Sequence, residues 1–524
     1  MPRVNFCGTS RVAPLLFLAI PIVAAPGSEP EKSDAVPVVR LGNIPKLRLA
    51  HATRASAQEA REIPQLIRRL ATIDRPDFGL SGTMSGHAFL PIDGMSKAGA
   101  LLLVDHQLRS SLELRKLVEL GLKALPFLLD ALDDQTPTKL VMKHEGFFDG
   151  MGFTNELSGN PVNRREIMIL GTRRQGPSLH GEHVDAYTVK VGDVCLVAIG
   201  QIVGRGYQAV RYQPTACIML NSPTHDAKLC RQVRDIWSSA DAAQTLFDSL
   251  LLDYATEGIF NGESLDGWGL GAYLQAEAAM RLLFYFPAES AEMIAHRLDK
   301  LDVKANGPGR GSAGGPGELD GYMKQCVANG VRADDFVKAV AWCREPRIKA
   351  AVLRVFERAT DPDVVLASLR SVGPDNPAKV SERLARMIAD LPAAEGGPFG
   401  DGYNLLVALG RYGGPETKSV FQKYLDVRTV QHCRSTCHAS REVRQEWAAE
   451  LLAPLLDDRR EADGWTYALN PEDDEPRLPI RVCDEAAETI TGANKDLRFE
   501  WRGTHANLDR QIKFIQDALR NTRN

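Results

Sequence analysis

The sequence predicts a mainly α-helical protein built from stacked helix pairs, and three observations carry this prediction. The stretch Leu112 to Leu132 carries two adjacent apolar stripes at helical spacing. Weaker copies of this pattern recur from about residue 275 onward. Between them, residues 138–192 change to short β-branched and apolar runs separated by turn-forming residues, which predicts a small β or irregular insertion.

The clearest helix pair is the stretch from Leu112 to Leu132. In its first helix, Leu114, Leu117 and Val118 recur at three- and four-residue steps, so they share one face. Gly121 follows, the residue type most able to adopt the left-handed conformation that ends a helix. Pro126 stands at the start of the second helix, where a missing N–H costs nothing. Neither helix can bury its stripe alone, so the pair must stack on other helices.

Composition and charge are those of an ordinary soluble protein. The chain has 524 residues, of which 44% are hydrophobic and 25% charged. This length predicts several domains or one elongated array, because a single core stops growing at smaller sizes. The 63 Lys and Arg residues nearly balance the 67 Asp and Glu residues, so no nucleic-acid partner is expected.

The N-terminus has the features of a secretory signal peptide over residues 1–25. Arg3 and Arg11 precede an apolar run, residues 12–25, that ends in small residues suited to cleavage. The run is shorter than the roughly 20 residues that span a bilayer. We therefore expect a secreted or periplasmic protein with no transmembrane helix after signal removal; an uncleaved N-terminal anchor is the alternative.

Cysteine usage is compatible with an oxidising compartment but assigns no disulfide. Signal cleavage would leave an even number of cysteines, namely Cys195, Cys217, Cys230, Cys326, Cys343, Cys433, Cys437 and Cys483. Several lie inside apolar helical patterns, where a free thiol packs as a small hydrophobic side chain.

The N-terminal half divides into four further segments. Residues 26–50, rich in Pro and charge, are expected to form a flexible tether. Residues 51–137 form an N-terminal helical unit, with a helix from Ala55 that kinks or breaks at Pro64 and another from about Lys97 to Leu120. The insertion, 138–192, follows. Residues 193–304 are expected to form helical pairs, beginning with a helix over 191–205 that has Asp193 as its N-cap, then a loop over 211–224 and helices over 226–237, 240–254 and 275–301.

The C-terminal half begins with a glycine-rich segment. Residues 305–321 are too rich in Gly to hold a fixed core and are expected to form a mobile loop. Residues 322–524 form a C-terminal helical region in which periodicity predicts helices or helix pairs over 347–372, 404–425, 442–456, 482–490 and 508–519.

The Leu112–Leu132 unit resembles a HEAT repeat. Such repeats have an aliphatic first helix, a Gly near the turn and an Ala-x-Pro-x-Leu start to the second helix; here these are Gly121, Ala124, Pro126 and Leu128. Residues 361–369, 414–425 and 481–490 look like degenerate copies, and 138–192 has no counterpart. The resemblance implies an α-solenoid whose concave surface binds other macromolecules. It implies no shared catalytic residues.

One short motif resembles a c-type haem attachment site. Cys433 and Cys437 are separated by three residues and followed at once by His438. Covalent haem c normally uses a two-residue separation, so the spacing departs from the usual motif. The same side chains could bind Zn²⁺, form a local disulfide, or decorate a loop between two helices.

A second cluster has side chains suited to a divalent metal. His180 and His183 lie close to Asp185 within the insertion. Their three-residue spacing differs from the four-residue spacing of metalloprotease helices, and a solvated polar loop is the alternative.

Taken together, the sequence predicts an exported, non-catalytic helical-repeat scaffold that binds an unidentified protein partner. Two alternatives of other classes stay open. One is a redox protein with haem at Cys433, Cys437 and His438, and the other is a hydrolase with its site in residues 138–192.

Overall fold

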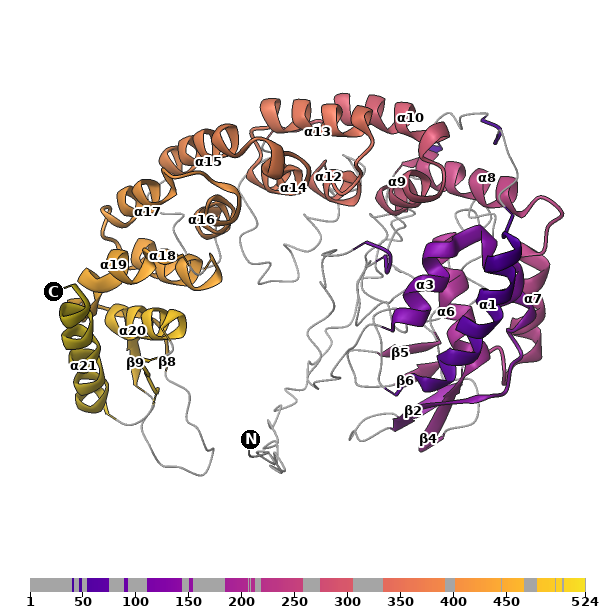
Figure 1. The fold of residues 1–524 in the computed structure, drawn as a ribbon, viewed down its shortest axis with the longest axis horizontal. Helices are drawn as coiled ribbons and strands as arrows, with labels where there is room; N and C mark the ends of the chain where they lie inside the picture. The colour runs from indigo at the N-terminus through magenta and orange to yellow at the C-terminus, as the bar shows by residue number, and fades with distance from the viewer. Residues whose placement is uncertain are drawn as a thin grey trace, which may run out of the picture. The chain divides into compact units, whose positions relative to one another are not determined.

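The computed structural model describes the chain in segments separated by gaps. The described residues are 40–41, 47–49, 54–74, 89–92, 111–143, 150–153, 184–205, 207, 209–212, 218–257, 274–304, 333–391, 401–443, 445–465, 478–494, 496–501 and 504–523. The signal peptide and the glycine-rich segment predicted above lie outside these residues, as do most of the tether and residues 97–110 of the second predicted helix. The described part is mainly helical (Figure 1), which confirms the predicted class.

The N-terminal helical unit begins with α1 (Ala57–Arg69) and a 3₁₀ turn, η1 (Leu70–Thr72). Ser56 caps α1, because its hydroxyl accepts from the Glu59 N–H at 3.2 Å while the Glu59 carboxylate accepts from the Ser56 N–H at 2.8 Å. Of the two alternatives predicted at Pro64, the break was wrong, because α1 runs through this residue. Burial of Ile63 and Ile67 on either side offsets the lost backbone hydrogen bond.

The Leu112–Leu132 unit folds as predicted into α3 (Leu112–Leu120), a 3₁₀ turn η2 (Gly121–Lys123) and α4 (Leu125–Asp130). Gly121 ends α3 with φ +52°. The ring of Tyr285 lies against Gly121, and its hydroxyl donates to the carbonyl oxygen of Val118 at 2.7 Å. The turn between the two helices is thus fixed by a side chain far away in the sequence.

The region after α4 contains short strands. Strand β2 (Pro137–Lys143) pairs antiparallel with β4 (Ala186–Lys190), and Thr138 and Val189 lie on the buried side. Strand β3 (Met151–Phe153) pairs parallel with β6 (Ile218–Leu220), which pairs antiparallel with β5 (Val210–Tyr212). The loop predicted over 211–224 therefore contains parts of two strands. Both strands have three residues, too few for periodicity to reveal them, and β6 also pairs with β3, which is distant in the chain. A further short pair joins β1 (Arg40–Leu41) and β7 (Thr256–Glu257).

The remaining elements are mostly helices. They are α6 (Val191–Val203), α7 (Ala227–Trp237), α8 (Ala242–Ala255), α9 (Leu274–Tyr285), α10 (Pro287–Asp299), α12 (Ala333–Val340), α13 (Pro346–Arg358), α14 (Pro362–Val372), η5 (Gly373–Asp375), α15 (Pro377–Asp390), α16 (Asp401–Tyr412), α17 (Thr417–Leu425), α18 (Val430–Val443), α19 (Ala448–Leu452), η6 (Ala453–Asp457), β8 (Glu461–Trp465), β9 (Pro479–Arg481), α20 (Val482–Ala493) and α21 (His505–Arg523).

Most of the predicted helices are confirmed. Helices over 226–237, 240–254 and 508–519 are present, and the predicted stretches 275–301 and 347–372 each contain two helices, the second beginning at Pro287 and at Pro362. Helices α12, α15 and α18 were not predicted. Among the described residues, no helix has both the length and the apolar character needed to cross a membrane.

We expect Gly121→Ala to lower the free energy of unfolding by about 2–3 kcal/mol, because a non-glycine residue is strained at this φ. The new Cβ would also lie 2.3 Å from Cε1 of Tyr285. Gly492→Ala is the matched control, since nothing lies within 4 Å of the added Cβ. Urea unfolding followed by circular dichroism measures the free energy of unfolding of both variants. Equal losses in the two variants would contradict the conformation assigned to Gly121.

Candidate functional site

The structure places the predicted haem motif inside a helix. Cys433, Cys437 and His438 all belong to α18, so the alternative of a loop between two helices was wrong. Both cysteines are fully buried, whereas the His438 side chain is 25% exposed. The four-residue step between the thiols puts them on one face of α18, and His438 points away from that face.

The two thiols face different neighbours. Cys433 lies near the turn that follows η6, with its Sγ 3.8 Å from Nη2 of Arg460. Burial raises the pKa of the Cys433 thiol. Cys437 faces α20, whose Thr489 hydroxyl donates to the Cys437 carbonyl oxygen at 3.4 Å. Burial, and then the nearby Glu485 carboxylate, raise the pKa of the Cys437 thiol well above its ordinary value.

These residues do not fit covalent haem. Attachment needs both thiols at the wall of a space that admits the macrocycle, with the histidine ring reaching its iron. Here both thiols are packed among side chains of α18, α20 and the turn after η6, and all six cysteines in the described residues are free thiols. A haem at Cys433 and Cys437 would have to displace α20.

A buried ion pair joins α18 to α20. Nε of Arg434 lies 3.0 Å from Oε1 of Glu485, and both side chains are almost fully buried. Nε2 of His438 lies 3.5 Å from the same oxygen. Further along both helices, Arg441 pairs with Glu488. The two helices are therefore fixed in register by charge at two places.

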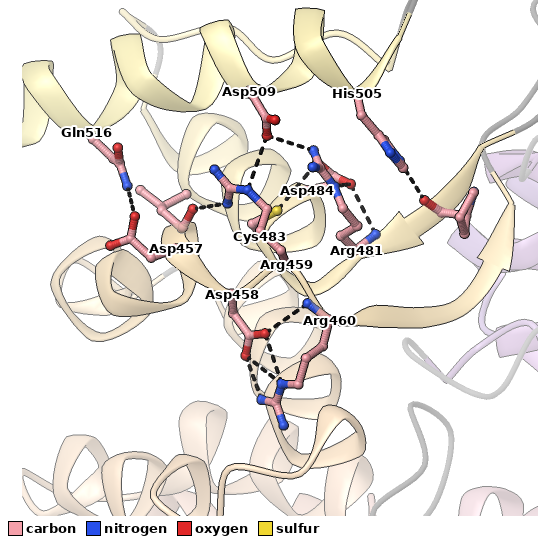
Figure 2. Close-up of polar contacts among 12 residues, drawn as sticks. Asp457, Asp458, Arg459, Arg460, Arg481, Cys483, Asp484, His505, Asp509 and Gln516 are labelled. Carbon is pink, nitrogen blue, oxygen red and sulfur yellow. Dashed lines mark hydrogen bonds and ion pairs between the residues drawn. The ribbon is translucent and has the colours of Figure 1, made fainter.

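A second charged cluster lies where α21 covers α20 and η6 (Figure 2). Asp509 of α21 lies 3.0 Å from the Arg481 guanidinium and 3.3 Å from that of Arg459. Arg481 also makes a two-pronged contact with Asp484, at 3.0 and 2.9 Å.

Further polar contacts surround this cluster (Figure 2). Gln516 of α21 donates to Asp457 at 2.8 Å, a ring nitrogen of His505 lies 3.0 Å from the Pro479 carbonyl oxygen, and Asp458 binds Arg460. Each carboxylate of the cluster faces a guanidinium or an amide, an arrangement that holds helices together.

A third polar cluster lies at the start of α6. The carboxylate of Asp193 accepts from the hydroxyls of Tyr187 at 2.7 Å, Ser222 at 2.7 Å and Thr224 at 3.1 Å, and from the Lys190 N–H at 2.9 Å. Asp193 is therefore not the N-cap that the sequence predicted. It is the third residue of α6, and its carboxylate accepts from the backbone N–H of Lys190, the residue before the helix. Burial raises the pKa of Asp193 despite these donors.

The Asp193 cluster contains Ser, His and Asp, but not in the order of a nucleophilic triad. Ser222 donates directly to Asp193, and the ring of His225 stacks on Phe153 with 3.7 Å between ring centroids. A triad needs the histidine ring between the hydroxyl and the carboxylate. The arrangement caps a helix and connects it to β4.

The predicted metal ligands His180 and His183 lie outside the described residues. Within the described ranges, no group of three or more His, Cys, Asp or Glu side chains is placed to hold a metal ion.

Comparison with known proteins finds no match: no protein-family model matches the chain, and neither a curated protein nor a solved structure matches it.

Sequence reasoning missed the two residues that join α18 to α20. Arg434 stands inside the motif that drew attention for its cysteines, and Glu485 stands inside a segment identified only as a degenerate repeat. A charged residue at a core position of an amphipathic helix is the signal that could have found either one.

We expect Glu485→Ala to lower the free energy of unfolding by about 3–5 kcal/mol, because it leaves the Arg434 charge buried without its partner. The double variant Arg434→Met/Glu485→Leu should recover most of this loss, since it removes both charges. The control is Arg386→Met, which breaks a pair that is mostly exposed and should cost less than about 0.5 kcal/mol. A double variant no more stable than Glu485→Ala would contradict the pairing.

We expect Cys433, Cys437 and Cys483 to resist thiol reagents in the native protein at pH 8. All three are buried, and burial together with the Asp484 carboxylate raises the pKa of Cys483 to about 11. Iodoacetamide labelling followed by peptide mass mapping measures each thiol, and the urea-denatured protein is the positive control. Rapid labelling of Cys437 in the native state would contradict its placement.

Proposed function

We propose that the chain is a non-catalytic scaffold whose helix pairs stack as an α-solenoid of the HEAT type and bind a protein partner. The proposal includes export to a secreted or periplasmic location, as the N-terminal sequence predicts. The observation that carries it is the order in which the helices pack.

From α8 onward, one continuous series of helices packs each on the next. The packed neighbours are α8 with α9, α9 with α12, α12 with α14, α14 with α16, α16 with α18, and α18 with α20 (Figure 1). Helices between them pack against this series, as α13 does on α14 and α15 on α16. Such nearest-neighbour stacking is what a helical-repeat protein uses to bury stripes that no single pair can bury.

Ion pairs between successive units support the same arrangement. Arg354 of α13 makes a two-pronged contact with Asp299 of α10, at 2.9 and 2.8 Å. Arg411 of α16 pairs with Glu442 of α18 at 3.0 Å. These pairs are largely exposed and each adds little stability, so their effect is on register.

The nature of the partner follows from what the chain does not offer. Its near-neutral charge gives no electrostatic reason to bind nucleic acid. The polar clusters at α6 and α18 make internal contacts that connect structural elements, which favours a structural role over a catalytic one. A protein partner that contacts exposed side chains on successive helices is the class that remains.

The experiment is cross-linking of the full chain to its partner in intact cells, followed by binding measurements with both purified proteins. We expect a saturable complex whose cross-links fall on several successive helices, because solenoid binding surfaces are composed of residues from many repeats. Cross-links confined to one loop, or substrate turnover by the purified chain, would contradict the proposal.

Two spectroscopic and analytical controls address the other classes. A Soret band in natively exported protein would overturn the scaffold in favour of haem at Cys433, Cys437 and His438. A bound metal that is lost, together with a hydrolytic activity, in His180→Ala or His183→Ala would favour the hydrolase.

A further inference from the structure

Two distant parts of the chain repeat the same backbone contacts, and the first lies around the start of α6. The Val191 N–H donates to the carbonyl oxygen of Thr136 at 2.9 Å, and the Gly192 N–H donates to that of Asp134 at 3.1 Å. The antiparallel β2–β4 pair that precedes α6 begins with Pro137 opposite Lys190. The segment before β2 is thereby fixed to the first turn of α6.

The second part lies around the start of α20. The Val482 N–H donates to the carbonyl oxygen of Arg460 at 3.1 Å, and the Cys483 N–H donates to that of Asp458 at 2.9 Å. The hairpin that precedes α20 begins with Glu461 opposite Arg481. Donors, acceptors and strand register correspond residue by residue to those at α6.

The sequences at these contacts match as well. Leu-Asp-Asp precedes the first strand in both places, at 132–134 and at 456–458. The second strand ends on a basic residue in both places, Lys190 and Arg481. Val, one variable residue and Asp follow it, at 191–193 and at 482–484. The aspartate accepts from the backbone N–H three residues earlier in each case, at 2.9 Å in Asp193 and 3.0 Å in Asp484.

A covering helix completes each part. Arg234 of α7 contacts Asp133 at 2.8 Å, and Gln516 of α21 contacts Asp457 at 2.8 Å. Both helices place apolar side chains against the core at the same spacing from these residues. They are the buried Cys230, Val233 and Trp237 in α7, and the buried Ile512 and Ile515 with the half-buried Leu519 in α21.

We infer that the described residues within 125–237 and within 448–523 form two copies of one module, in which an aspartate at the third position of a helix joins that helix to an antiparallel strand pair. The capping contact alone is common among helices. The shared strand register, the two shared backbone bonds and the matching covering helix are independent of it. The inference does not depend on the scaffold proposal, and it means that the β2–β4 pair has a counterpart in the β8–β9 pair.

The copies differ in how the aspartate is held, and this difference makes the equivalence testable. In the first copy, the hydroxyls of Tyr187 and Ser222 donate to Asp193. In the second copy, the guanidinium of Arg481 donates to Asp484. If Lys190 and Arg481 occupy one position of one module, an arginine at residue 190 can replace the lost hydroxyl donor.

The experiment is hydrogen exchange with peptide-resolved mass spectrometry on the full chain. We expect Ser222→Ala to speed amide exchange in residues 186–193 by about tenfold, because a buried carboxylate loses a donor. Adding Lys190→Arg should restore most of the protection, while Lys139→Arg, a change at an exposed position of β2, should restore none. In the second copy, Arg481→Lys should speed exchange in residues 478–486 by a similar factor.

The inference is overturned if Lys190→Arg restores no protection, or if Arg481→Lys leaves residues 478–486 unchanged. Should Ser222→Ala fail to fold, Tyr187→Phe removes one donor at a half-buried position and is tested for the same rescue.

Discussion

An amphipathic helix that cannot bury its own apolar stripe is the constraint on which the structure depends. The series α8, α9, α12, α14, α16, α18 and α20 solves it because each member packs on the next. The stability of one helix therefore includes the surface that its neighbour supplies. Damage at one interface, such as that between α18 and α20, is expected to reach the units beside it more strongly than distant ones.

Charge has a different role from apolar burial in this chain. The buried pair of Arg434 and Glu485 gains little net free energy, because both ions are removed from water. It does penalise any other register, since a shift by one residue would leave two buried charges unpaired. The Arg481–Asp484 contact and the hydroxyls around Asp193 act in the same way at helix starts. Polar groups thus select one arrangement among the many that apolar packing would allow.

The sequence predicted the helical class and the Leu112–Leu132 unit, because apolar periodicity, Gly121 and Pro126 are local signals. It did not predict α18, whose polar residues such as Thr436 and Ser440 hide the helical period although the structure buries them. Strands β5 and β6 were also missed, because each has only three residues and β6 also pairs with β3, which is distant in the chain. For the candidate site, the cysteine motif attracted attention through spacing alone. Its true partners lie on α20, and no local pattern reports contacts between helices distant in the sequence.

The hydroxyl of Tyr285 that holds the turn at Val118 has a consequence for the order of folding. That hydrogen bond closes a loop of 167 residues, whereas the pairs between α10 and α13 close loops of 55 residues. Contacts between residues far apart in the chain form late, because the entropy of loop closure must be overcome first. The helices after α9 can condense one upon another as they become available. We therefore expect the N-terminal region to complete its folding after the helices that follow α9.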